Sequence, residues 1–234
     1  MKQIQHFIID GNINKETILI EDRELLNQMT SVLRYRVGDK CIVLDGKGMK
    51  ANGEIIEINR KFAKLNLTEH EACKRSEQKI RLFIAISKKP STFELIVQKA
   101  CELGVDEIIP LVTNRTQIDD LRKSDRLKFI MKEAAEQCER PFLPELKETL
   151  KFDEFVKNPP EGLILAGDAW DYDLKLKDIQ KNEIVNIIIG PEGGLTKEEL
   201  SMIRDIGGKI FLLGEYILRM ETAAIAAISV VRFG

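Results

Sequence analysis

Apolar residues beyond residue 79 gather in short blocks that alternate with longer amphipathic stretches. Four blocks have the length and composition of strands buried on both faces, as a parallel sheet requires: 80–86, 106–112, 162–167 and 184–189. Helical spacing of apolar residues appears in four stretches: 91–103, 124–138, one that starts after Thr196, and an alanine-rich one after Arg219. Strand and helix alternate to the end, which predicts an α/β domain.

The first seventy residues follow a different pattern, with short strands and glycine turns around one helix. Strands are expected at 4–9, 17–20, 40–44, 53–58 and 62–67, and a helix at 23–34. Such a meander predicts a compact barrel of about seventy residues. The polar segment 69–78 is the candidate linker, and we place the domains at 1–72 and 73–234.

A glycine-rich turn follows the strand 184–189. Gly190, Gly193 and Gly194 allow a sharp turn and a close approach of the backbone to a ligand, and Pro191 fixes φ within it. Thr196 and Glu199 have the spacing of a capping box, which predicts where the next helix begins. Loops at the carboxyl ends of neighbouring parallel strands converge where such sheets bind ligands. A tight strand-to-helix connection alone also fits this turn.

A second loop, 212–219, carries Gly214 and then places Arg219 in the otherwise apolar run 216–231. A guanidinium in such a run needs a partner or a ligand, because an uncompensated buried charge is costly. The two loops therefore indicate one binding crevice near the end of the chain.

At these residues the sequence resembles a known family. The segments IIIGPEGGLTKEEL (187–200) and LLGEYILRMETAAIAAISVV (212–231) are similar to the two C-terminal signatures of the RsmE family of the SPOUT superfamily. Further similarity covers 98–105, 114–115 and 133–140. The resemblance implies methylation of N3 of one uridine in 16S ribosomal RNA (m3U1498 in the family), with S-adenosylmethionine (AdoMet) as cofactor and no metal.

The resemblance also implies a particular fold. Family members carry a trefoil knot in the C-terminal third, although ordinary topology rules predict an unknotted sheet. AdoMet is bound by three loops, which correspond here to 165–167 (running on through 168–170), 190–194 and 212–219. The implied cofactor-binding residues are Leu165, Gly167, Gly190, Pro191, Glu192, Gly193, Gly194, Leu213, Gly214, Ile217, Leu218 and Thr222.

The chemistry of the implied reaction points to Arg219. Methyl transfer is a direct displacement at an electrophilic carbon, so positioning supplies most of the rate. Uridine N3 must lose its proton, and a cation near the pyrimidine stabilises the anion that forms. Arg219 is the candidate catalytic residue; the alternative is a salt bridge to Glu221 or Glu192 that holds the loop. The sequence indicates no general base.

The N-terminal domain resembles a PUA-like barrel with a "VLR…GD…DG.G" pattern, matched at 32–34, 38–39 and 45–48. This implies docking to RNA. Arg34 and Arg36 flank Tyr35, which offers cations for phosphate and a ring for stacking, although a solvated helix end also fits Arg34. Family members have a histidine where 28–31 reads QMTS and an arginine near the N-terminus where His6 stands.

Three more candidates for RNA contact remain open between two roles. His6 could contact phosphate or be a structural histidine. Arg115 and Arg140 lie at the ends of a strand and a helix, where an arginine binds phosphate or pins a loop.

Composition limits the partners. The formal charge is −2 overall, and it drifts from +2 over 1–75 through 0 over 76–150 to −4 over 151–234. No part is strongly basic, so RNA contact must come from local patches. Four cysteines without a CxxC pair make metal sites and disulfides unexpected.

The same features indicate compartment and partners. The N-terminus lacks the pattern of a signal peptide, and the run 222–231 is too short to span a bilayer. We expect a soluble cytoplasmic protein whose partner is 16S ribosomal RNA within the small ribosomal subunit, with neither membrane nor DNA. A homodimer is expected from the resemblance. Two alternatives remain: a SPOUT methyltransferase for another RNA base, and a non-catalytic RNA-binding protein with a vestigial pocket.

Overall fold

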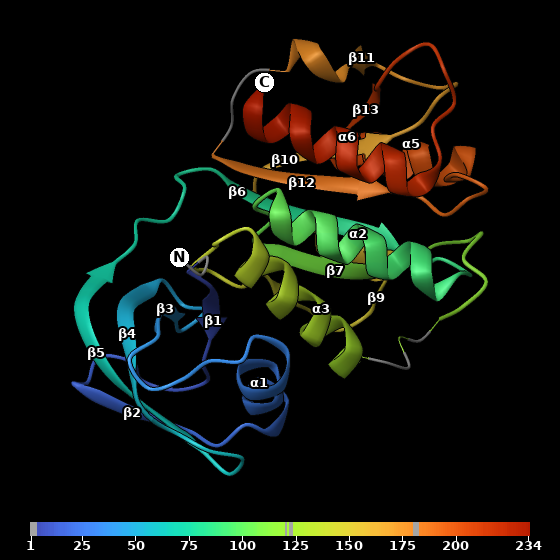
Figure 1. Ribbon diagram of the computed structural model, residues 1–234. Coiled ribbons are helices and arrows are strands. Elements are labelled where there is room, and N and C mark those ends of the chain that lie inside the picture. Colours follow the sequence, from blue (N-terminus) through green and yellow to red (C-terminus); the bar gives the residue numbers. More distant parts are fainter. Residues whose placement is uncertain (1–3, 120, 122–123, 180–182) are drawn as a thin grey trace. The chain divides into compact units, whose positions relative to one another are not determined.

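The computed structural model describes residues 4–119, 121, 124–179 and 183–234 (Figure 1). Contacts divide the chain into two compact units. The N-terminal unit comprises residues 1–75 together with 135–143, and the C-terminal unit comprises 76–134 and 144–234. The segment 135–143 thus groups with a part of the chain that lies far from it in sequence, which no local pattern had indicated.

The described part of the N-terminal unit contains a five-stranded sheet in the order β1-β3-β4-β5-β2. β1 pairs with β3 in parallel and the other neighbours pair antiparallel. The strands are β1 His6–Ile8, β2 Thr17–Ile20, β3 Lys40–Leu44, β4 Met49–Ile58 and β5 Ala63–Ala72. The strands predicted at 53–58 and 62–67 are therefore longer, and residues 69–72 of the expected linker belong to β5.

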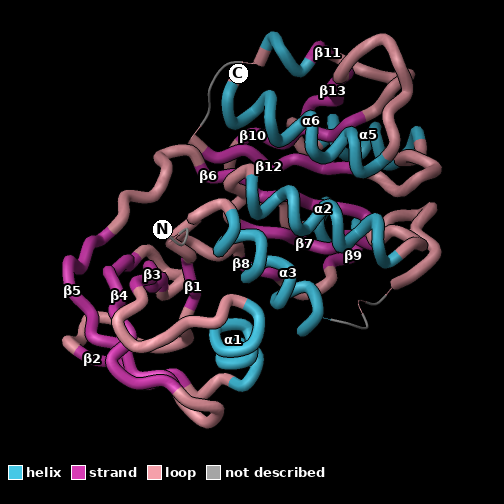
Figure 2. The backbone as a smooth tube through the Cα atoms, viewed as in Figure 1, coloured by secondary structure: helices cyan, strands magenta, loops and turns pink. Residues whose placement is uncertain are grey.

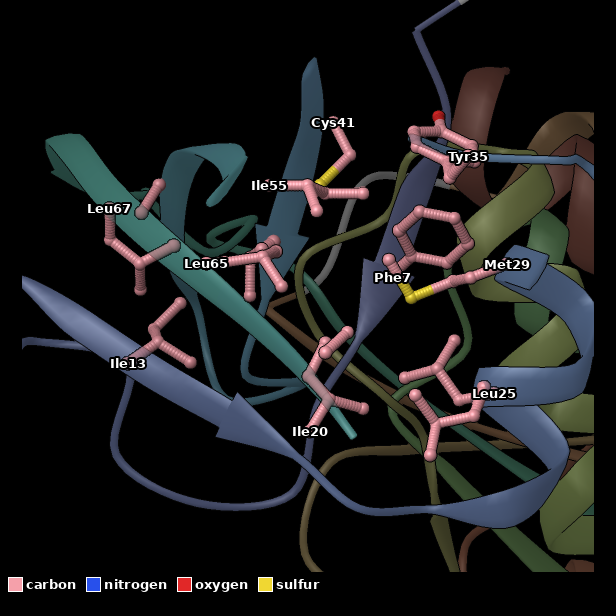
Figure 3. Packing of buried hydrophobic residues seen from close by; sticks show 14 residues of the cluster. Phe7, Ile13, Ile20, Leu25, Met29, Tyr35, Cys41, Ile55, Leu65 and Leu67 are labelled. Atoms are coloured by element: carbon pink, nitrogen blue, oxygen red, sulfur yellow. The ribbon is translucent and has the colours of Figure 1, made fainter. Parts of the chain in front are cut away.

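An apolar cluster fills the interior of this unit (Figure 3). Phe7 from β1, Ile55 from β4 and Leu65 from β5 are fully buried in it. The alternation of apolar and polar residues along the strands produces this arrangement, because successive side chains of a strand point to opposite faces.

The segment 135–143 packs on the turn that follows β3. The amide of Gly48 donates to the carbonyl of Pro141 at 3.0 Å, and the amide of Leu143 donates to the carbonyl of Gly46 at 2.8 Å. Gly48 has φ +114°, and a Cβ there would lie 2.3 Å from the Phe142 ring. The glycines of the 45–48 motif are thus required by chain packing.

The helix predicted at 23–34 is shorter and irregular. It begins with α1 Arg23–Asn27, capped by the Asp22 side chain, and continues as the π-helical turn η1 Gln28–Val32. The amide of Leu33 donates to the carbonyl of Gln28 at 2.9 Å, and the chain then turns sharply because Arg34 has φ +54°. A π turn inserts one extra residue into a helix, and apolar spacing alone does not reveal it.

The C-terminal unit is built on a parallel sheet, which confirms the predicted α/β class. In the described residues the strand order is β11-β13-β10-β12-β6-β7-β8, with β9 also on β7. All these pairs are parallel. The strands are β6 Lys79–Ala85, β7 Glu107–Val112, β8 Glu145–Leu146, β9 Leu150–Lys151, β10 Leu163–Gly167, β11 Leu174–Lys175, β12 Ile184–Ile189 and β13 Lys209–Leu212.

Helices pack on this sheet (Figure 2). Phe155 of α4 (Phe152–Lys157) and Ile203 of α5 (Lys197–Asp205) join the apolar cluster on one face. α2 (Pro90–Glu102) and α6 (Met220–Phe233) pack against each other, and Figure 1 shows them in front of the strands. α3 spans Ser124–Gln137. Burial on both faces explains why these strands are almost wholly apolar.

In the C-terminal unit, the start of α5 and the end of α2 follow the local signals closely. The capping box of Thr196 and Glu199 forms and starts α5 as predicted. Gly104 has φ +83° directly after α2, the left-handed conformation expected of a glycine cap. The sequence did not indicate the shortest elements: β8, β9, α4, β11 and the 3-10 turn η2 Leu176–Asp178.

Candidate functional site

A cavity of about 760 Å³ lies in the C-terminal unit, at the carboxyl ends of its strands. Because the strands are parallel and in register, the loops that follow β6, β10, β12 and β13 emerge at one edge of the sheet. Each of these loops, and the one after β7, contributes to the wall. The convergence predicted for the two glycine loops is therefore confirmed.

Most of the residues proposed for the cofactor line this cavity. They are Gly167, Gly190, Pro191, Glu192, Gly193, Gly194, Leu213, Gly214, Ile217 and Leu218, and Arg219 and Arg115 join them. Two candidates do not line it. Leu165 is fully buried within β10, and Thr222 lies on α6 between two lining residues, Glu221 and Ala223.

The glycine loop after β12 is held from several sides. The amide of Gly194 donates to the carbonyl of Pro191 at 2.8 Å, which closes the turn. A Cβ on Gly190 would come within 3.1 Å of the Leu195 amide nitrogen. The hydroxyl of buried Ser87 donates to Glu192 Oε1 at 2.6 Å. The backbone of this loop is thus fixed before any ligand arrives.

Arg115 is one of the residues that fix it. Its Nη1 donates to the carbonyl of Gly193 at 2.5 Å. Of the two roles left open for Arg115, the geometry supports the one in which the arginine pins a loop. Nearby, buried Glu199 accepts from the amides of Asn114 and Thr196, both at 2.8 Å. The start of α5 is therefore tied to the end of β7.

The loop after β10 is anchored by carboxylates. Asp168 Oδ1 accepts from the amides of Trp170 and Asp171 at 2.8 and 2.9 Å. Arg204 of α5 binds Asp171 at 2.7 Å and Asp173 at 2.9 Å. The hydrogen bond from Arg204 lowers the pKa of Asp171 below its usual value. These contacts give the loop a defined shape.

Arg219 lies directly before α6, where its carbonyl accepts from the Ala223 amide at 2.8 Å. Its side chain is exposed and lines the cavity. Within the described residues it forms no ion pair with Glu192, Glu221 or another carboxylate. The alternative of a loop-holding salt bridge is therefore wrong for this structure.

Several lining residues lie outside the three predicted loops. They include Lys89, Thr92, Asp171, Lys197 and Phe211. The signal for the first two was present, because 87–92 directly follows a buried strand that ends at the same edge. The charged side chains in the wall are four basic (Lys89, Arg115, Lys197, Arg219) and four acidic (Asp168, Asp171, Glu192, Glu221).

The N-terminal unit places the arginine pair and its tyrosine differently from the prediction. Arg34 and Arg36 are exposed, whereas Tyr35 is only 6 % exposed and packs edge-on against Phe7 with ring centroids 5.7 Å apart. Tyr35 therefore belongs to the core, and its proposed stacking role is wrong. The chain turns sharply at Arg34 (φ +54°), and the Tyr35 ring lies in the core while Arg34 and Arg36 are exposed.

His6 and Arg140 also lie in the N-terminal unit. The His6 side chain is largely buried, with Nδ1 3.8 Å from Glu139. Burial lowers the pKa of His6 more than Glu139 raises it, so the ring favours the neutral form at neutral pH. Arg140 is half-buried, and its amide donates to the carbonyl of Ala135 at 2.9 Å. The neutral ring suits a structural histidine better than a phosphate contact.

The described residues contain neither a metal-binding cluster nor a helix that could span a membrane. No group of three or more His, Cys, Asp or Glu side chains there has the arrangement of a metal site. No helix in that part of the chain is long and apolar enough to cross a membrane.

Comparison with known proteins gives consistent matches. Residues 74–232 match the family described as RNA methyltransferase domain, and residues 25–68 match the RNA methyltransferase PUA domain. The ribosomal RNA small subunit methyltransferase E of Aquifex aeolicus is 31% identical over 70% of this chain and 72% of its own length. That of Rickettsia conorii is 29% identical over 94% of this chain and 90% of its own length.

Solved structures agree with these sequence matches. The crystal structure of a ribosomal RNA small subunit methyltransferase E from Neisseria gonorrhoeae, bound to S-adenosyl methionine, superposes with a TM-score of 0.87 and 26% identity. The similarity covers 97% of this chain and 96% of that one. The C-terminal unit is therefore an RNA methyltransferase domain, the N-terminal unit contains a PUA-like domain, and the chain belongs to the family of the ribosomal RNA small subunit methyltransferases E.

Proposed function

We propose that this chain transfers the methyl group of AdoMet to N3 of a uridine in 16S ribosomal RNA, at the position m3U1498 of the family. The enzyme is an AdoMet-dependent ribosomal RNA methyltransferase. The observation that carries the proposal is that three loops meet in one cavity together with the side chain of Arg219, which forms no ion pair within the described residues. Two of these loops, after β10 and β12, are anchored by hydrogen bonds. The relatives named for this activity on the small ribosomal subunit support it.

The cavity suits AdoMet in size, charge and backbone access. Its volume lies in the usual range of about 300–1,000 Å³ for small-molecule sites. Acidic and basic side chains in equal number suit a ligand that carries an amine, a carboxylate and a sulfonium. Gly214 has open space where a Cβ would stand, so a ligand can approach its backbone closely.

The residues that we propose to hold AdoMet are the lining members of the three loops. Backbone groups of Gly167, Leu213 and Gly214 can hydrogen-bond an adenosine, and Ile217 and Leu218 offer apolar contact. Gly190 to Gly194 supply the opposite loop. Leu165 would support the site from beneath as a buried residue of β10, and Thr222 would act from the first turn of α6.

The protein's part in the chemistry is positioning and charge stabilisation. Bound AdoMet supplies a methyl group on a positively charged sulfur, which is already a good electrophile. As uridine N3 loses its proton, negative charge spreads over N3, O2 and O4, and the Arg219 guanidinium is the group that we assign to stabilise it. Because the loops after β10 and β12 are fixed by hydrogen bonds, this part of the wall needs little reorganisation during the step.

RNA binding is assigned to both parts of the chain. We propose residues 1–72 as the PUA-like RNA-binding domain and 73–234 as the methyltransferase domain, which the matches to 25–68 and 74–232 support. Exposed Arg34 and Arg36 are the best placed for phosphate contact. His6 and Arg140 are weaker candidates because of their burial. The cytoplasm follows as the proposed compartment because the substrate is ribosomal RNA.

Two further properties are proposed on the strength of the family. One is a trefoil knot in the C-terminal third, which the near-complete superposition on a family structure supports. The other is a homodimer. Sedimentation equilibrium tests the second directly, and a monomer at micromolar concentration would contradict it.

Methylation of isolated small ribosomal subunits tests the function. Subunits that lack this methyl group, incubated with the protein and labelled AdoMet, should gain one methyl per particle, and mass spectrometry should place it on N3 of one uridine. A methyl on another base would redirect the proposal to another RNA target. No transfer, together with no thermal stabilisation by AdoMet, would leave a non-catalytic RNA-binding protein.

Arg115→Ala is expected to weaken AdoMet binding about tenfold, because it removes a charged hydrogen bond that fixes the glycine loop. Isothermal titration with AdoMet measures the effect. Arg126→Ala, an exposed arginine on α3, serves as the matched control and should bind AdoMet normally. Unchanged AdoMet affinity combined with weaker RNA binding would instead support phosphate contact by Arg115.

A further inference from the structure

Two aromatic rings stand exposed at the wall of the cofactor cavity. Trp170 is 79 % exposed and Tyr216 is 81 % exposed, and both line the cavity. They belong to different loops, one after β10 and the other after β13. Trp170 is the single tryptophan of the chain, and Tyr216 is one of its three tyrosines. Large apolar rings left in water at a binding site commonly mark a recognition surface.

The exposure of Trp170 does not come from a loose loop. Asp168 Oδ1 accepts hydrogen bonds from the backbone amides of Trp170 and Asp171, at 2.8 and 2.9 Å. Arg204 clamps Asp171 and Asp173, and Asp173 Oδ2 in turn accepts from the amide of Ile210 in β13 at 2.8 Å. The backbone that carries the ring is thus fastened to α5 and the sheet. The indole ring of Trp170 is therefore exposed on a backbone segment that hydrogen bonds and ion pairs hold in place.

The proposed reaction creates a need for such a surface. N3 of uracil lies on the base-pairing edge, so the base must be unpaired and turned out of its stack before N3 is accessible. An extruded base loses the stacking on its neighbouring bases, and proteins replace this stacking with aromatic side chains. Stacking of a base on an aromatic ring stabilises the complex by about 1–3 kcal/mol. A site that methylates N3 therefore needs exposed aromatic rings close to Arg219, on which the extruded uracil can stack.

We propose that Trp170 and Tyr216 form the stacking surface that holds the target uracil at the cavity. This inference rests on the proposed function and extends it to the residues that position the nucleobase. Arg219, on the same loop as Tyr216, would then face the base held by the two rings. Stacking is tolerant of sequence, so the rings would hold the base and leave the choice of nucleotide to other contacts.

A kinetic comparison tests the role of the rings. Trp170→Ala and Tyr216→Ala should each raise KM for small ribosomal subunits about tenfold, while Trp170→Phe and Tyr216→Phe keep a ring and should stay within about threefold of the wild type. The affinity for AdoMet, measured by equilibrium dialysis, should be unchanged in all four. Tyr172→Ala is the matched control, because Tyr172 is exposed on the same loop but does not line the cavity.

Because Trp170 is the single tryptophan of the chain, its fluorescence directly reports contact of a base with the ring. With S-adenosylhomocysteine bound to prevent turnover, a single-stranded oligouridine should quench Trp170 fluorescence, because a stacked base quenches indole. A duplex of the same length, whose bases are already stacked, should not. Tyr216→Ala should require a higher oligouridine concentration for the same quenching, and Tyr172→Ala should not.

Several results would overturn the inference. Alanine variants with normal KM, phenylalanine variants as impaired as the alanine ones, or equal quenching by single strand and duplex would show that the rings do not stack on the base. A parallel loss of AdoMet affinity would assign them to the cofactor. A changed sedimentation coefficient in the alanine variants would assign them to a second copy of the chain. Failure of the wild type to methylate small subunits is a separate outcome, which refutes the proposed function itself.

Discussion

Replacing Arg219 with alanine should lower the rate of methyl transfer by about 10²–10³-fold and leave the affinity for AdoMet nearly unchanged. The expected loss is large because the guanidinium stabilises charge that appears on uracil only as the reaction proceeds. An interaction made only in the transition state affects kcat and leaves ground-state binding intact. Single-turnover methylation of small ribosomal subunits measures the rate, and isothermal titration measures the affinity.

The structure sharpens this expectation. Arg219 lines the cavity without an ion pair to any described carboxylate, so its removal leaves no buried charge behind and should not unfold the site. Arg219→Lys should recover part of the activity, because it retains the charge but not the planar fork. Lys197→Ala, which removes another cation from the same wall, is the control and should keep most of the rate. An equal loss of AdoMet affinity and of turnover in Arg219→Ala would refute a purely catalytic role.

Arg232→Met should lower the free energy of unfolding by about 3 kcal/mol, the cost of breaking a buried ion pair by removing one partner. Arg232 lies in the last turn of α6, with its side chain 11% exposed and Nη2 3.5 Å from Asp106, whose side chain is 5% exposed. Nη1 donates to the carbonyl of Gln78 at 2.9 Å and to the hydroxyl of Ser76 at 2.8 Å, and Nη2 donates to the carbonyl of Gly104. Urea unfolding followed by far-ultraviolet circular dichroism measures the change.

The expected loss of stability is large because removal of Arg232 leaves the Asp106 carboxylate buried without its cation. Asp106 also accepts from the amide of Ile80 at 2.9 Å, so its carboxylate remains in place and buried when Arg232 is absent. Methionine preserves most of the volume, which isolates the loss of charge and hydrogen bonds from the loss of packing. Lys128→Met, at an exposed position of α3 with its partner Asp125 3.9 Å away, should cost less than about 0.5 kcal/mol. Similar losses in the two variants would contradict the assignment.

The local features of the methyltransferase domain could be predicted because local chemistry sets them. The strand at Ile184–Ile189, the capping box of Thr196 and Glu199, and the left-handed cap at Gly104 all appear where the pattern placed them. Each depends on neighbours within a few residues. The two glycine loops and Arg219 belong to the same class, since their place after strands is visible in the order of apolar blocks.

Short elements and conformations without a local signature were not predictable. The π turn at Gln28–Val32 differs from an α-helix by one residue per turn, and the left-handed Arg34 that follows it has no local signature either. Tyr35, next in the chain, lies in the core, where the sequence had predicted a surface ring. The segment 135–143 joined the N-terminal unit through contacts with the 45–48 turn. No pairwise pattern in the sequence links residues separated by about ninety positions.

The sequence by itself determined the fold class of each domain, the position of the two glycine loops, and the presence of Arg219 next to one of them. These features depend on apolar periodicity, glycines and capping residues, which set the conformation of residues close to them in the chain. Only the tertiary structure decided which loops share one cavity, since that depends on the strand order β13-β10-β12-β6. It also decided that Arg115 holds the Gly193 carbonyl, and that Trp170 stands in solvent on a loop fastened by Arg204. These features depend on contacts between segments that are far apart in the sequence. The pattern of residues along the chain does not reveal which of these contacts are stable enough to form.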